Sequence, residues 1–177
     1  MPVFDIISKL PDNFPLPVIV IMHRSSSYKS SIEDMLNLKS KAVVREVGDK
    51  DKLKQGNVYF APSDYHLLIE PDGSLTLDCS EPVWYCRPSI DVTFQSVADV
   101  YKDHVIAILL SGANSDGADG LCYIREKKGL TIVQNPDEAE VRTMPDAAIE
   151  KGGADLIFTN LEICSFMSTL ATAIKNG

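Results

Sequence analysis

The sequence predicts one α/β domain: a doubly wound, mostly parallel sheet with helices on both faces and a short antiparallel hairpin excursion. Short runs rich in Val and Ile alternate with segments of helical spacing, which is the pattern of βαβ units. The 177 residues suit a single core, so we expect one domain over 1–177. Apolar residues make up 45% of the chain and charged residues 24%, the usual mixture for a folded globular protein.

The expected strands and helices alternate along the chain. Short apolar runs predict buried strands at 18–22, 105–110, 130–133 and 155–158. Apolar positions spaced i, i+3, i+4 and i+7 predict helices at 3–10, 90–101 and 163–174. Pro11 ends the first of these helices, Ser89 is expected to cap the second, and Asn160 the last.

The stretch from Val43 to Cys86 has a different character. It holds short strand candidates at 58–60, 66–69 and 75–77. Pro71-Asp72-Gly73, between the last two candidates, is a tight-turn signal. We therefore expect this stretch to form an antiparallel excursion inside the α/β domain.

Net charge, apolar run length and the spacing of cysteines and histidines exclude several classes of partner and cofactor. The 17 Lys and Arg against 25 Asp and Glu give a net charge of −8, which excludes nucleic acid as an expected partner. The longest apolar run, Pro17 to Met22, is too short to span a bilayer, so no membrane insertion is expected. The four cysteines form no CxxC pair and Met1 opens no signal peptide, so we expect reduced thiols in the cytoplasm. The scattered His and Cys residues lack metal-ligand spacing, and no metal is expected.

In open parallel sheets, ligands bind beyond the carboxyl ends of the strands. His23 directly follows the strand predicted at 18–22, although a surface histidine in a polar loop is the alternative. The strand at 105–110 leads into the glycine-rich turn 111–120. Gly112 to Gly117 has the GxxxxG spacing of a phosphate-binding loop, but the Lys and Ser or Thr that should follow are absent. Nucleotide binding is therefore excluded for this turn.

Asp116 in that turn has two interpretations. Either Ser115 or Asp116 caps the helix that follows, or Asp116 orients a histidine across the crevice. In the second case, His23 and Asp116 supply two members of a Ser-His-Asp triad, in which the histidine takes the serine proton. No strand end offers the serine, and 25–27 is a run of serines unusually close to His23. Backbone N–H groups of 112–114 would donate to an oxyanion.

Six further segments occur in a recognisable order along nearly the whole chain. They are Leu10–His23, Gly56–Pro62 with His66, Arg87–Val92, Leu110–Ala118, Gln134-Asn135 and Met144–Ile149. Together they resemble the catalytic domain of the chemotaxis protein-glutamate methylesterase (CheB) family. Any one segment is a weak signal, and their joint order makes the match specific.

The resemblance implies a serine hydrolase of chemotaxis phosphorelay signalling, which removes methyl groups from glutamate γ-methyl esters and in some members deamidates glutamine. It implies that His23 is the base, Asp116 its orienting acid and the Ala113 backbone N–H an oxyanion donor, with no cofactor needed. His66 and Met144 are candidates for the substrate crevice; a solvated hairpin histidine is the alternative for His66. The implied partner is a methylated chemoreceptor-type protein.

The chain departs from the family pattern in three places. The family's opening strand, and the serine-bearing turn after it, have no counterpart, so we expect the chain to be N-terminally incomplete and inactive by itself. Ala113-Asn114 replaces a Met-Gly pair, and we expect no receiver domain ahead of the hydrolase. The alternative is a non-catalytic receptor-binding relative that has lost the nucleophile. An exposed sheet edge could also recruit a second copy of the chain.

Overall fold

A computed structural model describes residues 1–24 and 32–176. Its helices are α1 (Pro2–Ser8), α2 (Ile32–Lys39), α3 (Ile90–Tyr101), α4 (Ala118–Glu126), α5 (Thr143–Glu150) and α6 (Asn160–Asn176), with the 3₁₀ turns η1 (Lys102–His104) and η2 (Pro136–Glu138). Its strands are β1 (Val18–Val20), β2 (Val43–Glu46), β3 (Asn57–Phe60), β4 (His66–Ile69), β5 (Leu75–Asp78), β6 (Ile106–Leu109), β7 (Leu130–Gln134) and β8 (Leu156–Phe158).

The strands form two parallel groups and one hairpin. One group has the order β1-β3-β2 and the other the order β6-β7-β8, and every pairing within them is parallel. The hairpin β4-β5 is antiparallel, with Leu67 opposite Leu77. This confirms the predicted α/β class with a mostly parallel sheet and a short antiparallel hairpin.

The extent of the antiparallel excursion differs from the expectation. Among the named strands only β4 and β5 pair antiparallel, because β2 and β3 pair in parallel with each other, and β3 also pairs with β1. Two isolated antiparallel bridges, Lys52 with Ser74 and Val83 with Cys86, lie outside these strands. Periodicity reveals that a short apolar run is a strand but not the direction of its partner. The expected hairpin excursion over 43–86 was therefore too long by two strands.

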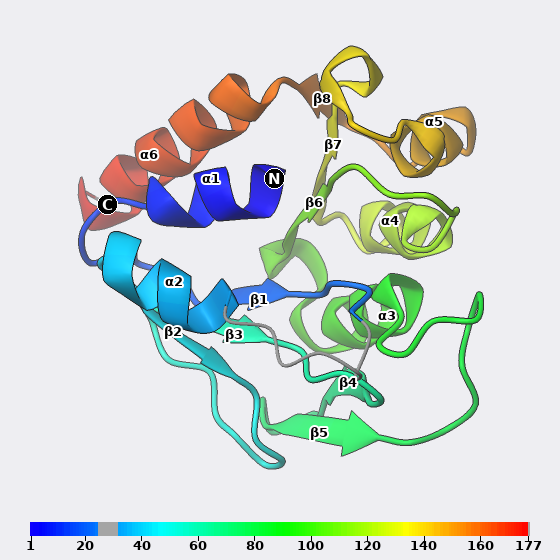
Figure 1. The fold of residues 1–177 in the computed structure, drawn as a ribbon, viewed down its shortest axis with the longest axis horizontal. Helices are drawn as coiled ribbons and strands as arrows, with labels where there is room; N and C mark the ends of the chain where they lie inside the picture. Colours follow the sequence, from blue (N-terminus) through cyan, green and yellow to red (C-terminus); the bar gives the residue numbers. More distant parts are fainter. Residues whose placement is uncertain (25–31, 177) are drawn as a thin grey trace.

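Helices cover both faces of the strands. In Figure 1, α1, α2 and α6 lie on one side, and α3, α4 and α5 lie on the other. The side chains of β7 alternate between these layers: Ile132 packs in the core with α1, α2 and α6, and Val133 packs in the core with α3, α4 and α5. Tyr59 of β3 packs instead against the hairpin. Within the described residues, no helix is long and apolar enough to cross a membrane.

The last helix begins with a capping arrangement that the sequence analysis missed. The Thr159 hydroxyl accepts a hydrogen bond from the Glu162 backbone N–H (3.2 Å), and the Glu162 carboxylate accepts one from the Thr159 N–H (2.8 Å). This reciprocal pair is the capping box of a Thr-x-x-Glu sequence. Thr159 is therefore the cap, and the expectation for Asn160 was wrong; the Asn160 amide oxygen accepts instead from Gln134 (3.1 Å).

The two parallel groups are separated by an apolar cavity of about 410 Å³. β1 pairs on one side with β3, and β6 pairs on one side with β7. Residues of both strands line the cavity, together with Phe94 and Val97 of α3 and Met167 of α6. Within the described residues, β1 and β6 thus each have one edge without a strand partner, and both strands line this cavity.

Candidate active site

The loop after β6 is held at its start by two neighbouring segments. The Ser111 N–H donates to the buried Gln134 side chain at the end of β7 (2.7 Å). The Gly112 N–H donates to the Val141 carbonyl (3.1 Å), and the Met144 N–H donates to the Gly112 carbonyl (3.0 Å). These bonds fix the path of the chain from the end of β6 toward Asp116.

The loop ends at a position that requires glycine. Gly117 has φ +94°, a conformation that side chains rarely adopt. A Cβ there would lie 2.6 Å from Leu109 Cδ1 and 2.8 Å from Ile90 Cγ2. Gly117 therefore lets β6 and α3 approach the loop closely, and it places Asp116 beside the N-terminus of α3.

The Asp116 carboxylate is fully buried and accepts four hydrogen bonds. One oxygen, Oδ2, accepts from His23 Nε2 (2.7 Å) and from the Ile90 N–H (2.7 Å). The other, Oδ1, accepts from the Ser89 hydroxyl (2.8 Å) and from the Asp91 N–H (3.0 Å). Ser89 also caps α3, so the carboxylate sits at the positive end of that helix.

The ionisation of Asp116 follows from these contacts. Burial alone would raise the pKa of this carboxyl, but the hydrogen bonds from His23, the α3 backbone and Ser89 outweigh it, and the pKa lies below its ordinary value. Asp116 is therefore a carboxylate at neutral pH, suited to stabilise a positive charge on the His23 ring.

The His23 side chain lies just beyond β1, and 26% of its surface is exposed. Because Nε2 bonds the carboxylate, Nδ1 is the ring nitrogen left to accept a proton from a nucleophile. The structure thus brings together two residues that are 93 positions apart in the sequence. The capping interpretation of Asp116 was wrong: Gly117 is the N-cap of α4, and it makes no side-chain cap hydrogen bond.

The Ala113 backbone lies between the fixed start of the loop and Asp116. Ala113 is exposed, and within the described residues nothing accepts a hydrogen bond from its N–H. The next residue, Asn114, accepts from the Asp116 N–H (3.2 Å). A free N–H in a fixed loop can donate to a developing negative charge without prior rearrangement.

Comparison with known proteins identifies the family. Residues 2–167 match the family model described as CheB methylesterase. The chain belongs to the CheB methylesterase family.

Similar proteins extend this assignment along the chain. A relative from Leptospira interrogans, provisionally named protein-glutamate methylesterase/protein-glutamine glutaminase, is 39% identical over 158 residues, which are 87% of this chain and 80% of the relative. A Symbiobacterium thermophilum protein with the same two activities in its name is 33% identical over 97% of this chain, but the match spans only 47% of that relative. The crystal structure of the Thermotoga maritima CheB methylesterase catalytic domain superposes with a TM-score of 0.89 at 31% identity, covering 97% of this chain and 91% of that one.

His66 of this CheB methylesterase chain is fully buried. Its Nδ1 accepts from the Ser89 N–H (3.1 Å), and its Nε2 is bonded to the Glu81 carbonyl (3.1 Å). The alternative of a solvated hairpin histidine was therefore wrong, and a role for His66 in the substrate crevice stays a prediction. The His66 ring thus fixes the Ser89 backbone, and the Ser89 hydroxyl bonds the Asp116 carboxylate. His66 therefore helps to position Asp116 through Ser89.

Met144 is also buried and packs against the loop. A Cβ on Gly112 would lie 2.3 Å from Met144 Cε, so the methionine lies directly against this glycine. Met144 thus packs against the residue that precedes Ala113 in the loop. A role for Met144 in the substrate crevice stays a prediction.

Hydroxyl groups near the pair differ in their availability. The 25–27 serine run lies outside the described residues. The Ser89 hydroxyl is buried and occupied by Asp116, and the Ser111 hydroxyl is bonded to the Val141 N–H (2.9 Å) and carbonyl (3.1 Å). Sequence reasoning also missed that the start of α3 holds Asp116; the available signal was the family-like segment Arg87–Val92.

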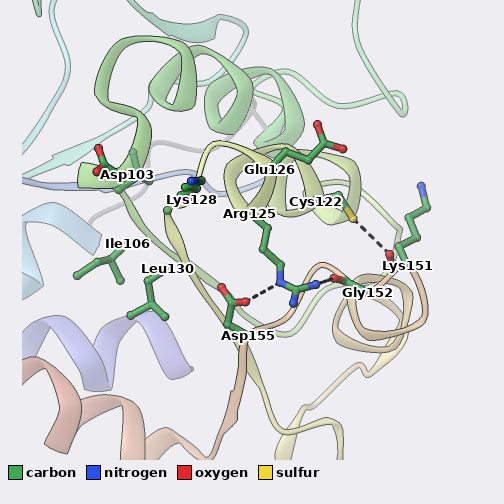
Figure 2. A pocket seen from close by; sticks show the side chains of 12 residues that line it. Asp103, Ile106, Cys122, Arg125, Glu126, Lys128, Leu130, Lys151, Gly152 and Asp155 are labelled. Atoms are coloured by element: carbon green, nitrogen blue, oxygen red, sulfur yellow. Dashed lines mark hydrogen bonds and ion pairs between the residues drawn. The ribbon is translucent and has the colours of Figure 1, made fainter.

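A separate hollow of about 830 Å³ lies at the amino ends of β6, β7 and β8. Figure 2 shows Arg125 between Asp155 and Gly152 there; its Nε donates to Asp155 Oδ1 (2.5 Å) and its Nη1 to the Gly152 carbonyl (2.6 Å). The ion pair of Arg125 with Asp155 thus lies in this hollow, at the end of the sheet opposite His23 and Asp116. Within the described residues, no cluster of His, Cys, Asp or Glu suits a metal ion.

Proposed function

We propose that this chain carries the base and the orienting acid of a methylesterase that hydrolyses glutamate γ-methyl esters on chemoreceptor-type proteins. The observation that carries the proposal is the 2.7 Å contact between His23 Nε2 and the fully buried Asp116 carboxylate. Both residues follow parallel strands at their carboxyl ends, the edge where ligands bind in this class of fold.

The proposed reaction has two steps. A serine hydroxyl attacks the ester carbonyl while His23 Nδ1 takes its proton, and Asp116 stabilises the imidazolium. The carbonyl oxygen becomes an oxyanion and accepts a hydrogen bond from the Ala113 N–H. The tetrahedral intermediate collapses, the His23 proton passes to the leaving methoxy group, and methanol departs. Water then attacks the acyl-serine, with His23 taking the water proton and returning it to the serine, which frees the glutamate.

The same residues would support glutamine deamidation. The relatives' names include a glutaminase activity. In that reaction the leaving group is ammonia instead of methanol, and it needs the same proton from His23. We include deamidation in the proposal because the two substrates differ only in this leaving group.

The serine must reach His23 from outside the described residues. The cavity between β1 and β6 supports one route, because its walls are apolar and each flanking strand has an unpaired edge. A parallel strand seated between them would end at the same edge as His23 and the 111–117 loop. We propose that such a strand delivers the nucleophile, as the family resemblance implies.

The decisive experiment measures methanol release from a methylated chemoreceptor by the protein isolated from its own cells. His23→Ala should lower the rate by about 10³-fold or more, because the base is lost. His104→Ala is the matched control: this histidine ends the 3₁₀ turn η1 with 83% of its side chain exposed, far from Asp116 at the other end of β6, and its removal should leave the rate unchanged.

Two results would contradict the proposal. Unchanged methanol release by His23→Ala would remove the assigned base. Receptor binding without any methanol release by the unaltered protein would favour the second function, a non-catalytic receptor-binding relative. The intact mass and N-terminal sequence of the native protein would then show whether a serine-bearing strand accompanies this domain.

A further inference from the structure

The loop between β5 and α3, which is bonded through Cys86 to Asn114 of the proposed site, exposes two large aromatic side chains. Tyr85 is fully exposed, and 49% of the Trp84 surface is exposed. In Figure 1 this loop extends outward on the side toward which β1 points, and His23 follows β1 closely along the chain. Exposed aromatic residues next to a reactive centre mark a surface where another molecule binds.

The backbone at these two residues is unfavourable for aromatic side chains. Trp84 has φ +51° and Tyr85 has φ +60°. Val83 and Cys86 on either side exchange two backbone hydrogen bonds, of 3.1 and 2.8 Å, so the segment is a two-residue hairpin turn. Such turns favour Asn and Gly at both central positions. Stability alone therefore does not explain why Trp and Tyr occupy these two positions. Residues that are unfavourable for their backbone conformation are often retained for function.

The turn is attached to the frame that holds Asp116. The Asn114 amide donates to Cys86 Sγ (3.4 Å), and the same side chain accepts from the Asp116 N–H (3.2 Å). Three residues beyond Cys86, the Ser89 hydroxyl bonds the Asp116 carboxylate. On the other side, the Arg87 guanidinium donates to the carbonyls of Cys79 and Ser80 (both 2.7 Å) and closes the loop at its base.

We propose that Trp84 and Tyr85 form the docking surface for the polypeptide that flanks the esterified glutamate of the protein substrate. The inference rests on the proposed function, because an ester carried on another protein brings a polypeptide surface with it to the site. With its ester carbonyl at Ala113 and His23, that polypeptide continues past the site over the anchored turn. The occupant is a basic segment of that polypeptide, since aromatic faces bind cations and the chain carries a net charge of −8.

Trp84 itself supplies the test, because it is the single tryptophan of the sequence. A methylated chemoreceptor is titrated into the His23→Ala protein, in which the ester persists, and tryptophan emission is recorded. Docking should shift the emission to shorter wavelength in a saturable way. Tyr85→Gly, which suits the turn, should weaken the apparent Kd by about tenfold or more. Leu38→Gln removes another largely exposed apolar side chain, from α2, and should leave the Kd unchanged.

Activity measurements separate this inference from the function on which it rests. Tyr85→Gly in the otherwise unaltered protein should lower kcat/KM for the receptor through KM, and leave hydrolysis of a small glutamate γ-methyl ester within about twofold. Methanol release with no emission change on titration would overturn the docking surface and leave the function intact. A saturable emission change without methanol release would support the surface and contradict the esterase. Equal weakening of binding by Leu38→Gln would also overturn it.

Discussion

Two aspartates, Asp116 and Asp155, lie at opposite ends of the β6-β7-β8 group. They accept similar numbers of hydrogen bonds, but one contacts a histidine and the other an arginine. Asp116, at the carboxyl end, is fully buried against His23 and the start of α3. Asp155, at the amino end, bonds Arg125 (2.5 Å) and both the N–H and hydroxyl of Thr131 (3.0 and 2.9 Å). Burial works against ionisation at both sites, yet hydrogen bonds lower both pKa values.

The difference lies in the partner. An arginine guanidinium does not give up its proton in proteins, so the pair of Arg125 with Asp155 cannot carry a proton transfer. An imidazole ring can both accept and release a proton, so the pair of His23 with Asp116 can carry one. A lowered carboxyl pKa alone therefore does not mark a catalytic acid; the chemistry depends on the group that the carboxylate contacts.

The largest expected effect is at Asp116. Asp116→Asn should lower methanol release from a methylated chemoreceptor by about 10³–10⁴-fold, because the amide neither fixes the His23 tautomer nor stabilises its charged form. Steady-state kinetics at pH 7 measure this directly. Retention of more than a tenth of the rate would remove Asp116 from the proposed mechanism.

Asp155→Asn is the matched substitution at the other end. It should leave methanol release within about twofold, and reduce the free energy of unfolding by about 1–2 kcal/mol, since the lost ion pair is partly exposed. Urea unfolding and the same kinetic assay measure the two quantities. If Asp155→Asn lowered methanol release as much as Asp116→Asn does, the proposed difference in role between the two aspartates would be wrong.

The smallest expected effect is on how steeply the free energy of unfolding decreases at acid pH. A carboxyl whose pKa is lowered by folding contributes stability above its unfolded pKa, near 4, and loses that contribution as the pH falls through its folded pKa. Urea unfolding between pH 7 and pH 2 should therefore show a flatter acid decline for Asp116→Asn than for the unaltered protein. An identical pH dependence of stability in the two proteins would mean that these contacts do not lower the pKa of Asp116.

The residues at the strand ends could be predicted from the sequence, because each strand and the polar residue after it are adjacent. His23 follows an apolar run, and Asp116 lies in a glycine-rich turn after another. Their mutual contact came from the family resemblance and the sheet rule rather than from spacing, since 93 positions separate them.

Other features depend on contacts that are distant in the sequence. The parallel pairing of β2 and β3 leaves no local signal in strands of four residues each. The burial of His66 depends on Ser89 and Glu81, which only the folded loop brings to it. The capping box at Thr159 and Glu162 was readable from the sequence, and Asn160 beside it misled the prediction.

The division of the strands into two groups has a consequence for folding. His23 belongs to the β1-β3-β2 group, and Asp116 belongs to the β6-β7-β8 group, so their contact closes a long loop of chain. Contacts of such high sequence separation form after local helices and hairpins. We therefore expect the contact between His23 and Asp116 to form late as the chain folds, after the local structure of each group.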